Sequence, residues 1–272
     1  MEILISLEVF IIGLIFGSFI NMAVYRVRQE LPFSGRSFCD HTKKTLTWKD
    51  LFPIGSFIFY KGRCRHCSKK LPILYPIVEF ITGLTFLAGA HFIFRDFLQE
   101  PWLPLNLTIT VFYILVMLFF AVYDYLYWEV NVRAIKYSLI TGIVFSIIAL
   151  LLKDNALVID GFSSLIAGFV SGLIILLVVR LTKGSGMGEG DIFLMALAGL
   201  AVGLDGLIPL FMISSISGSI IGIFKAIKIK KFHGVQIQFV PFISFATLVV
   251  FFWKDQILKL LYLDNFFSLF NI

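Results

Sequence analysis

The chain has 272 residues, of which 59% are hydrophobic and 15% are charged, and its formal net charge is +6. Soluble globular proteins are about half apolar and about a quarter charged, so this composition excludes a disordered chain, a nucleic-acid-binding domain and a secreted disulfide scaffold. It indicates a polytopic membrane protein that is surrounded by a lipid bilayer and has no nucleic-acid partner. The three cysteines are an odd number, which favours a metal site or isolated thiols over a closed set of disulfides.

Apolar segments follow one another along the chain and predict an all-α fold with about eight transmembrane helices. No cationic region precedes the first segment, so we expect a true span there and not a cleaved signal peptide. Only a short stretch that includes Gly203 and Gly206 separates the sixth segment from the seventh. The segments cover about 3–27, 73–94, 105–123, 132–152, 162–181, 192–204, 207–227 and 239–253.

Lys and Arg residues are concentrated in alternate connections, and this orients the predicted helices. The loop of residues 28–72 carries ten cations against three acids, and the even-numbered connections are poor in cations. By the positive-inside rule, the odd-numbered connections lie in the cytoplasm and both termini lie outside it. The expected organisation is a first transmembrane helix (1–27), a cytoplasmic cysteine-containing loop domain (28–72), a core of helices 2 to 8 (73–261) and a C-terminal tail (262–272).

The cytoplasmic loop contains all three cysteines and two histidines. Cys64 and Cys67 have the C-x-x-C spacing that lets two thiolates bind one tetrahedral Zn²⁺. Cys39 and His41 are the candidates for the other two ligands. Such a small segment often needs a metal or a partner surface to be stable. The alternative is a degenerate site, in which the thiols stay free and reduced on the cytoplasmic side.

Two aspartates fall at the cytoplasmic ends of predicted spans: Asp124 follows the third span and Asp191 begins the sixth. Two carboxyl groups that share a low-dielectric site also share one proton, so one can activate water while the other protonates the leaving group, as in aspartic proteases. Gly188 and Gly190 precede Asp191 and would let an extended substrate backbone approach it. The alternatives are that Asp124 is an interfacial residue and that Asp191 only caps a helix.

These motifs together resemble the type IV prepilin peptidase family, the bifunctional leader peptidases and N-methyltransferases of pilus and type II secretion systems. The resemblance covers nearly the whole chain. Residues 188–191 match the G-x-G-D signature of intramembrane aspartyl proteases, and Asp124 stands where the family has its first catalytic aspartate. One departure is Thr42, which replaces the second cysteine of the family's first C-x-x-C. Other matching motifs are G-S-F-I-N at 17–21, G-R-C-R-H-C at 62–67, Y-P-I-V-E at 75–79 and V-P-F at 240–242.

The resemblance implies an aspartyl endopeptidase of the bacterial inner membrane, with Asp124 and Asp191 as catalytic residues. It would remove the short leader of type IV prepilins or pseudopilins at the cytoplasmic face, and proteolysis would need no cofactor. The resemblance also implies methylation of the new N-terminus with S-adenosylmethionine. Glu79 is the candidate methylation residue, although its position alone is more typical of a hydrogen-bonded packing residue than of a catalyst. Two other classes remain open from the residues: a transporter with membrane carboxylates as relay groups, and a catalytically inactive scaffold.

Overall fold

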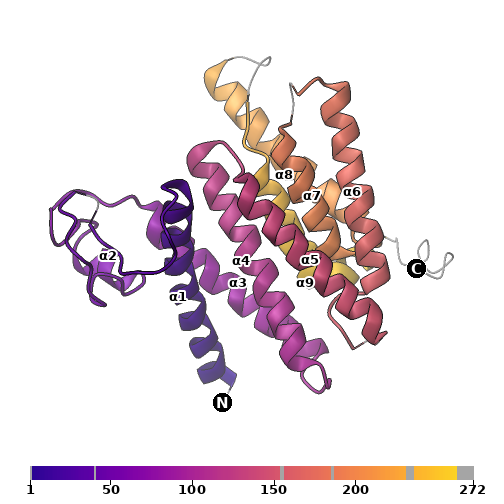
Figure 1. The fold of residues 1–272 in the computed structure, drawn as a ribbon, viewed down its shortest axis with the longest axis horizontal. Coiled ribbons are helices and arrows are strands. Elements are labelled where there is room, and N and C mark those ends of the chain that lie inside the picture. Colours follow the sequence, from indigo (N-terminus) through magenta and orange to yellow (C-terminus); the bar gives the residue numbers. More distant parts are fainter. Residues whose placement is uncertain (1, 40, 154–155, 185–186, 231–235, 262–272) are drawn as a thin grey trace. The chain divides into compact units, whose positions relative to one another are not determined.

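The computed structural model describes residues 2–39, 41–153, 156–184, 187–230 and 236–261. Over these residues the protein is helical, and the β-type pairings are two isolated bridges in the loop after the first helix. Figure 1 shows the helices in chain order. They are α1 (Glu2–Arg28), α2 (Gly55–Phe59), α3 (Leu74–Asp96), α4 (Leu103–Tyr127), α5 (Val132–Leu152), α6 (Gly161–Leu181), α7 (Glu189–Val202), α8 (Leu207–Ile229) and α9 (Val240–Leu260).

The expected all-α membrane fold is confirmed. Among the described residues, seven helices are long and apolar enough to span a membrane: α1, α3, α4, α5, α6, α8 and α9. The expected sixth span is α7, which has only 14 residues and therefore a length of about 21 Å. A helix this short is more typical of a buried core helix than of an independent span. The expected tail, residues 262–272, lies outside the described residues.

The chain forms two compact units, residues 1–94 and 95–272. The first unit contains α1, α2, the long loop and nearly all of α3, and the second contains α4 to α9. The cysteine-containing loop thus belongs to one unit with the two long helices that flank it.

In the first unit, α1 and α3 pack closely because glycines lie between them. A Cβ atom on Gly13 would come within 2.8 Å of the α3 backbone, and one on Gly17 would lie 2.5 Å from the Cα atom of Glu79. Small residues at such a contact let two helix backbones approach each other. The side-chain amide of Asn21 adds a hydrogen bond of 3.1 Å to the carbonyl of Tyr75. The start of α3, including Glu79, is therefore fixed against α1.

Two buried charged side chains hold the long loop to these helices. Arg26 is 5% exposed and donates to three backbone carbonyls of residues 32–35 at 2.7 to 2.9 Å. Glu79 is 8% exposed and accepts the backbone N–H of Ile54 at 2.7 Å. Buried charges are tolerated when hydrogen bonds replace their hydration, and here they also order the loop.

In the second unit, α7 contacts α5, α6, α8 and α9, and nine of its 14 residues are buried. It packs on α6 through small residues. A Cβ atom on Gly199 would lie 2.3 Å from the hydroxyl oxygen of Ser171, which donates to the carbonyl of Met195 at 2.9 Å. This close packing fixes α7 in the unit, and with it the N-terminal turn that carries Asp191.

The N-terminal end of α4 is fixed by Asn106, whose side chain is fully buried. Its amide donates to the carbonyl of Ala156 at 2.8 Å, and its oxygen accepts the N–H of Val158 at 3.0 Å. Along its length α4 packs against α9. Both contacts position the opposite end of α4, where Asp124 lies.

Candidate functional site

Asp124 lies in the last turn of α4 and is 6% exposed. The helix ends at Trp128, which has a left-handed backbone (φ 57°) and donates its N–H to the carbonyl of Asp124 at 2.8 Å. The carboxyl oxygen Oδ2 of Asp124 is buried and has no hydrogen-bond partner among the described residues. A buried carboxyl oxygen without a partner is costly. Such an oxygen is a candidate for contact with water or a reactant.

Asp191 is the third residue of α7 and is 9% exposed. Its Oδ2 atom accepts the N–H of Gly188 at 2.9 Å, so this carboxylate also closes the first turn of the helix. Gly188 is extended (φ −85°, ψ 163°) and does not use a positive φ. Among the described residues, a Cβ atom there would meet only Asp191 within 4 Å. The glycine therefore leaves open space beside the carboxylate.

The structure brings the two aspartates together in the second unit. A Cβ atom on Gly190 would lie 2.7 Å from Cβ of Val130, so only a glycine lets the start of α7 pack against the connection that follows α4. At this contact the carboxyl groups of Asp124 and Asp191 lie within electrostatic reach of each other. Two nearly buried carboxyl groups that interact electrostatically have the composition of a general acid and a general base.

Gln238 is a residue of this site that the sequence analysis missed. Its side-chain amide donates to the backbone carbonyl of Asp124. Nearby, the ammonium group of Lys225 lies 4.9 Å from the ring centre of Trp128 and donates to the carbonyl of Gln236 at 2.7 Å. These contacts tie the segment before α9 and the end of α8 to the last turn of α4. In the sequence, the only sign of this role is a polar residue two positions before the V-P-F motif.

In the first unit the three cysteines form one cluster. All three Sγ atoms lie within 4.8 Å of one another, and those of Cys39 and Cys64 are 3.7 Å apart. A tetrahedral Zn²⁺ with Zn–S bonds of about 2.3 Å holds its sulfur ligands about 3.8 Å apart, so Cys39, Cys64 and Cys67 fit three positions of such an ion. His41 is not in the cluster: it is exposed, and its Nδ1 atom lies 3.2 Å from Nζ of Lys69.

Two turns of the same form present these thiols. In the first turn, the N–H of Lys43 donates to the carbonyl of Cys39 at 2.8 Å. In the second, the N–H of Ser68 donates to the carbonyl of Cys64 at 2.8 Å. Both donor residues have a left-handed backbone, with φ of 55° and 57°. The first turn thus keeps the shape of the second, although it lacks the C-x-x-C spacing.

Thr42 occupies the place in the first turn that Cys67 occupies in the second. Hydrogen bonds from its hydroxyl and its backbone N–H to the sulfur lower the pKa of the Cys39 thiol to about 6. The N–H of Lys69 lowers the pKa of Cys67, but burial and the two neighbouring thiols together raise it above its ordinary value. The residue that departs from the family pattern therefore favours the thiolate form of Cys39, which is the form that binds metals.

Glu79 lies in the first unit and holds the loop, as described above. Its Oε2 atom accepts the N–H of Ile54 at 2.7 Å, and the hydroxyl of Ser18 also bonds to the carboxylate. Glu79 lines the same cavity as the three cysteines. The predicted residues therefore fall into two groups: the aspartates with their glycines in the second unit, and Glu79 with the cysteines in the first.

Comparison with known proteins divides the chain in a similar way. Residues 11–93 match the bacterial peptidase A24 N-terminal domain, and residues 111–223 match the type IV leader peptidase family. The chain is 29% identical to a prepilin leader peptidase/N-methyltransferase of Bacillus subtilis over 92% of this chain and 95% of the relative. It is 28% identical to a protein of the same description from Vibrio cholerae, over 89% and 94% of the two chains. No solved structure gives a significant match.

Proposed function

Because the chain belongs to the type IV leader peptidase family, we propose that it cleaves the leader from prepilins or pseudopilins with Asp124 and Asp191 as an acid–base pair. The observation that supports this proposal is that two nearly buried carboxyl groups, one in the last turn of α4 and one in the first turn of α7, interact electrostatically. The named relatives supply the substrate class, since they are described as prepilin leader peptidases.

In the proposed mechanism the two carboxyl groups share one proton, because ionising both would place like charges side by side. The ionised group takes a proton from water as the oxygen attacks the scissile carbonyl. The protonated group gives its proton to the leaving nitrogen as the C–N bond breaks. The open space at Gly188 would admit an extended substrate backbone. The products are a leader carboxylate and a new N-terminal amine.

The decisive experiment is leader cleavage by the purified protein in proteoliposomes, with a prepilin whose leader ends in glycine. We expect Asp124→Asn and Asp191→Asn to abolish cleavage while the variants remain folded. Glu189→Gln is the matched control, because Glu189 is exposed and lies two residues before Asp191. Cleavage that survives either aspartate change would refute the two-aspartate mechanism. Absence of cleavage by the unaltered protein would favour a scaffold.

We further propose that the chain N-methylates the new amine, as the names of its relatives suggest. S-adenosylmethionine would supply a methyl group whose carbon leaves a sulfonium sulfur and bonds to the amine nitrogen, with release of one proton and S-adenosylhomocysteine. The chain's own part is to bind the donor and to accept or place that proton. Glu79, a nearly buried carboxylate on the wall of a cavity, is our candidate for this part.

The remaining proposals concern metal and membrane. Cys39, Cys64 and Cys67 would hold one Zn²⁺, which would join the two turns of the loop and stabilise it. From the positive-inside rule we propose that the loop and both aspartates lie at the cytoplasmic face of the inner membrane; both termini then lie on the other side when α7 is counted as a crossing together with the seven longer helices. Cysteine labelling with a membrane-impermeant reagent, at single cysteines added to successive connections, tests this orientation.

A further inference from the structure

Residues 48–59 of the long loop carry large apolar side chains that the first unit leaves exposed. Four of these side chains are exposed over 59% to 78% of their surface: Trp48, Phe52, Ile58 and Phe59. Single exposed apolar residues are common on proteins, but a group of large ones within one short segment marks a contact with a protein or a membrane.

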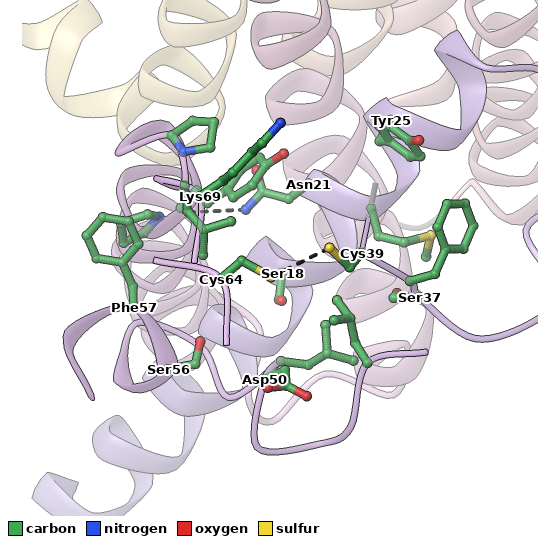
Figure 2. A pocket seen from close by; sticks show the side chains of 18 of the residues that line it. Ser18, Asn21, Tyr25, Ser37, Cys39, Asp50, Ser56, Phe57, Cys64 and Lys69 are labelled. Atoms are coloured by element: carbon green, nitrogen blue, oxygen red, sulfur yellow. Dashed lines mark hydrogen bonds between the residues drawn. The ribbon is translucent and has the colours of Figure 1, made fainter. Parts of the chain in front are cut away.

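The short helix α2, within this segment, has one face toward the first unit and one face away from it. Ser56 and Phe57 line a cavity of about 430 Å³, which the three cysteines also line (Figure 2). Ile58 and Phe59 lie outside that lining and are exposed. The N–H of Ile58 donates to the carbonyl of Ile54 at 3.0 Å, so the turn that presents these side chains is ordered. The outward apolar face is therefore a built feature of the loop.

A hydrogen bond sets the level of α2 along the membrane-spanning helix α3. The N–H of Ile54 donates to the Glu79 carboxylate at 2.7 Å, and α2 begins at the next residue. Glu79 is five positions after Leu74, the first residue of α3, which is about 7.5 Å along the helix at about 1.5 Å per residue. The cavity behind α2 is also lined by α1 residues between Ser18 and Arg26, which belong to a candidate span as α3 does. The segment therefore lies beside the first turns of two spans and not beyond their ends.

Basic residues stand next to the exposed apolar ones. Lys49 follows Trp48, and its Nζ atom lies 5.6 Å from the centre of that ring. Lys61 follows α2 by two residues and is exposed. The whole loop of residues 28–72 carries ten cations against three acids. Aromatic and basic residues together are typical of surfaces at the headgroup level of a bilayer, and the positive charge is complementary to anionic lipids.

We propose that residues 48–59 are a membrane-docking segment. The four exposed apolar side chains enter the boundary between the headgroups and the acyl chains of an anionic leaflet, and Lys49 and Lys61 contact lipid phosphates. Interfacial segments are buried about 5–10 Å into this boundary, which agrees with the level of α2 beside α3. Docking would hold the loop against the bilayer as well as against α1 and α3. This inference does not rest on the proposed peptidase or methyltransferase activity.

The test is tryptophan fluorescence of the full chain in lipid nanodiscs of phosphatidylglycerol and phosphatidylcholine, with no other protein present. Trp102, Trp128 and Trp253 are replaced by phenylalanine, so that Trp48 is the only tryptophan. We expect lipids brominated near the headgroup to quench Trp48 roughly twofold or more better than lipids brominated at the end of the acyl chain. Aqueous iodide should quench it weakly.

The electrostatic part is tested by a charge reversal in the same single-tryptophan chain. Lys49→Glu combined with Lys61→Glu should reduce quenching by brominated phosphatidylglycerol by roughly half or more, because two attractive charges become repulsive. Lys43→Glu combined with Lys44→Glu is the matched control, because both are exposed lysines of the same loop outside the segment. Equal losses in the two double variants would refute the contribution of Lys49 and Lys61.

The apolar part is tested by Ile58→Ser combined with Phe59→Ser, which should make Trp48 more accessible to iodide. Thermal unfolding in detergent shows whether each variant is folded. The unaltered chain gives a second measurement: trypsin cleavage after Lys49 should be roughly fivefold slower in nanodiscs with phosphatidylglycerol than in phosphatidylcholine alone, whereas cleavage after Lys44 should not change. Strong iodide quenching of Trp48 without quenching by brominated lipid, or equal cleavage after Lys49 in both lipids, would overturn the proposal and leave this surface to a protein partner.

Discussion

Replacing Gln238 by leucine should slow leader cleavage with little effect on stability. The change removes the only side-chain amide that donates to the backbone carbonyl of Asp124 among the described residues. That carbonyl also accepts the N–H of Trp128 at 2.8 Å, so it keeps one partner. We therefore expect a loss of about 1 kcal/mol in the free energy of unfolding, the net value of one ordinary hydrogen bond.

The expected effect on the cleavage rate, expressed as a free energy of activation, is larger than this loss of stability. A displacement of about 1 Å in a reacting group can cost on the order of 100-fold, and Gln238 restrains the turn that carries the Asp124 carboxyl group. The kcat for cleavage should fall by roughly 10- to 100-fold, while KM stays within a factor of about three. Gln238→Asn keeps the amide but shortens the side chain by one methylene, and it should give an intermediate rate.

The assay is cleavage of a purified prepilin in proteoliposomes, with kcat and KM determined separately and thermal unfolding measured alongside. Gln236→Leu is a close control: it is the same substitution two residues earlier, at an exposed side chain whose backbone carbonyl is unaffected. An equal loss of kcat in Gln236→Leu would refute the reasoning. So would a Gln238→Leu variant with an unchanged rate, or one whose loss lies entirely in KM.

Three further predictions concern the two units. Purified protein should contain about one zinc per chain by plasma emission spectrometry. Cys64→Ser should lose the zinc, whereas His41→Ala should retain the zinc, since His41 lies outside the thiol cluster. Gly199→Ala should lower the thermal unfolding temperature, because its Cβ would lie 2.3 Å from a hydroxyl oxygen. Gly222→Ala is the control and should be neutral or stabilising, because its Cβ would lie 3.6 Å from the nearest atom. Equal changes in unfolding temperature would contradict this packing argument. Arg26→Met should speed limited proteolysis of the loop after α1, because three backbone carbonyls lose a charged donor; an unchanged digestion rate would show that this clamp is dispensable.

The amino-acid sequence was sufficient for the membrane class and for most helices. Long apolar runs must form helices in a bilayer, because every backbone polar group needs an internal partner there. The spans expected at 132–152 and 162–181 match α5 and α6 to within one residue. The sixth segment is a separate case, because it forms α7, which has only 14 residues. The run at 192–204 is apolar because α7 is buried among other helices, and hydropathy alone does not distinguish burial in protein from burial in lipid.

The sequence also indicated candidate residues for the chemistry, because carboxylates and thiols are rare in so apolar a chain. It left open how they are grouped. Asp124 and Asp191 are 67 positions apart, and the packing of Gly190 against Val130 brings the start of α7 to the connection that follows α4. Cys39 joins Cys64 and Cys67 because two turns share one shape, although their spacing differs. Gln238 gains its role from a contact with a distant segment, since a bond to a backbone carbonyl leaves no pattern in the sequence.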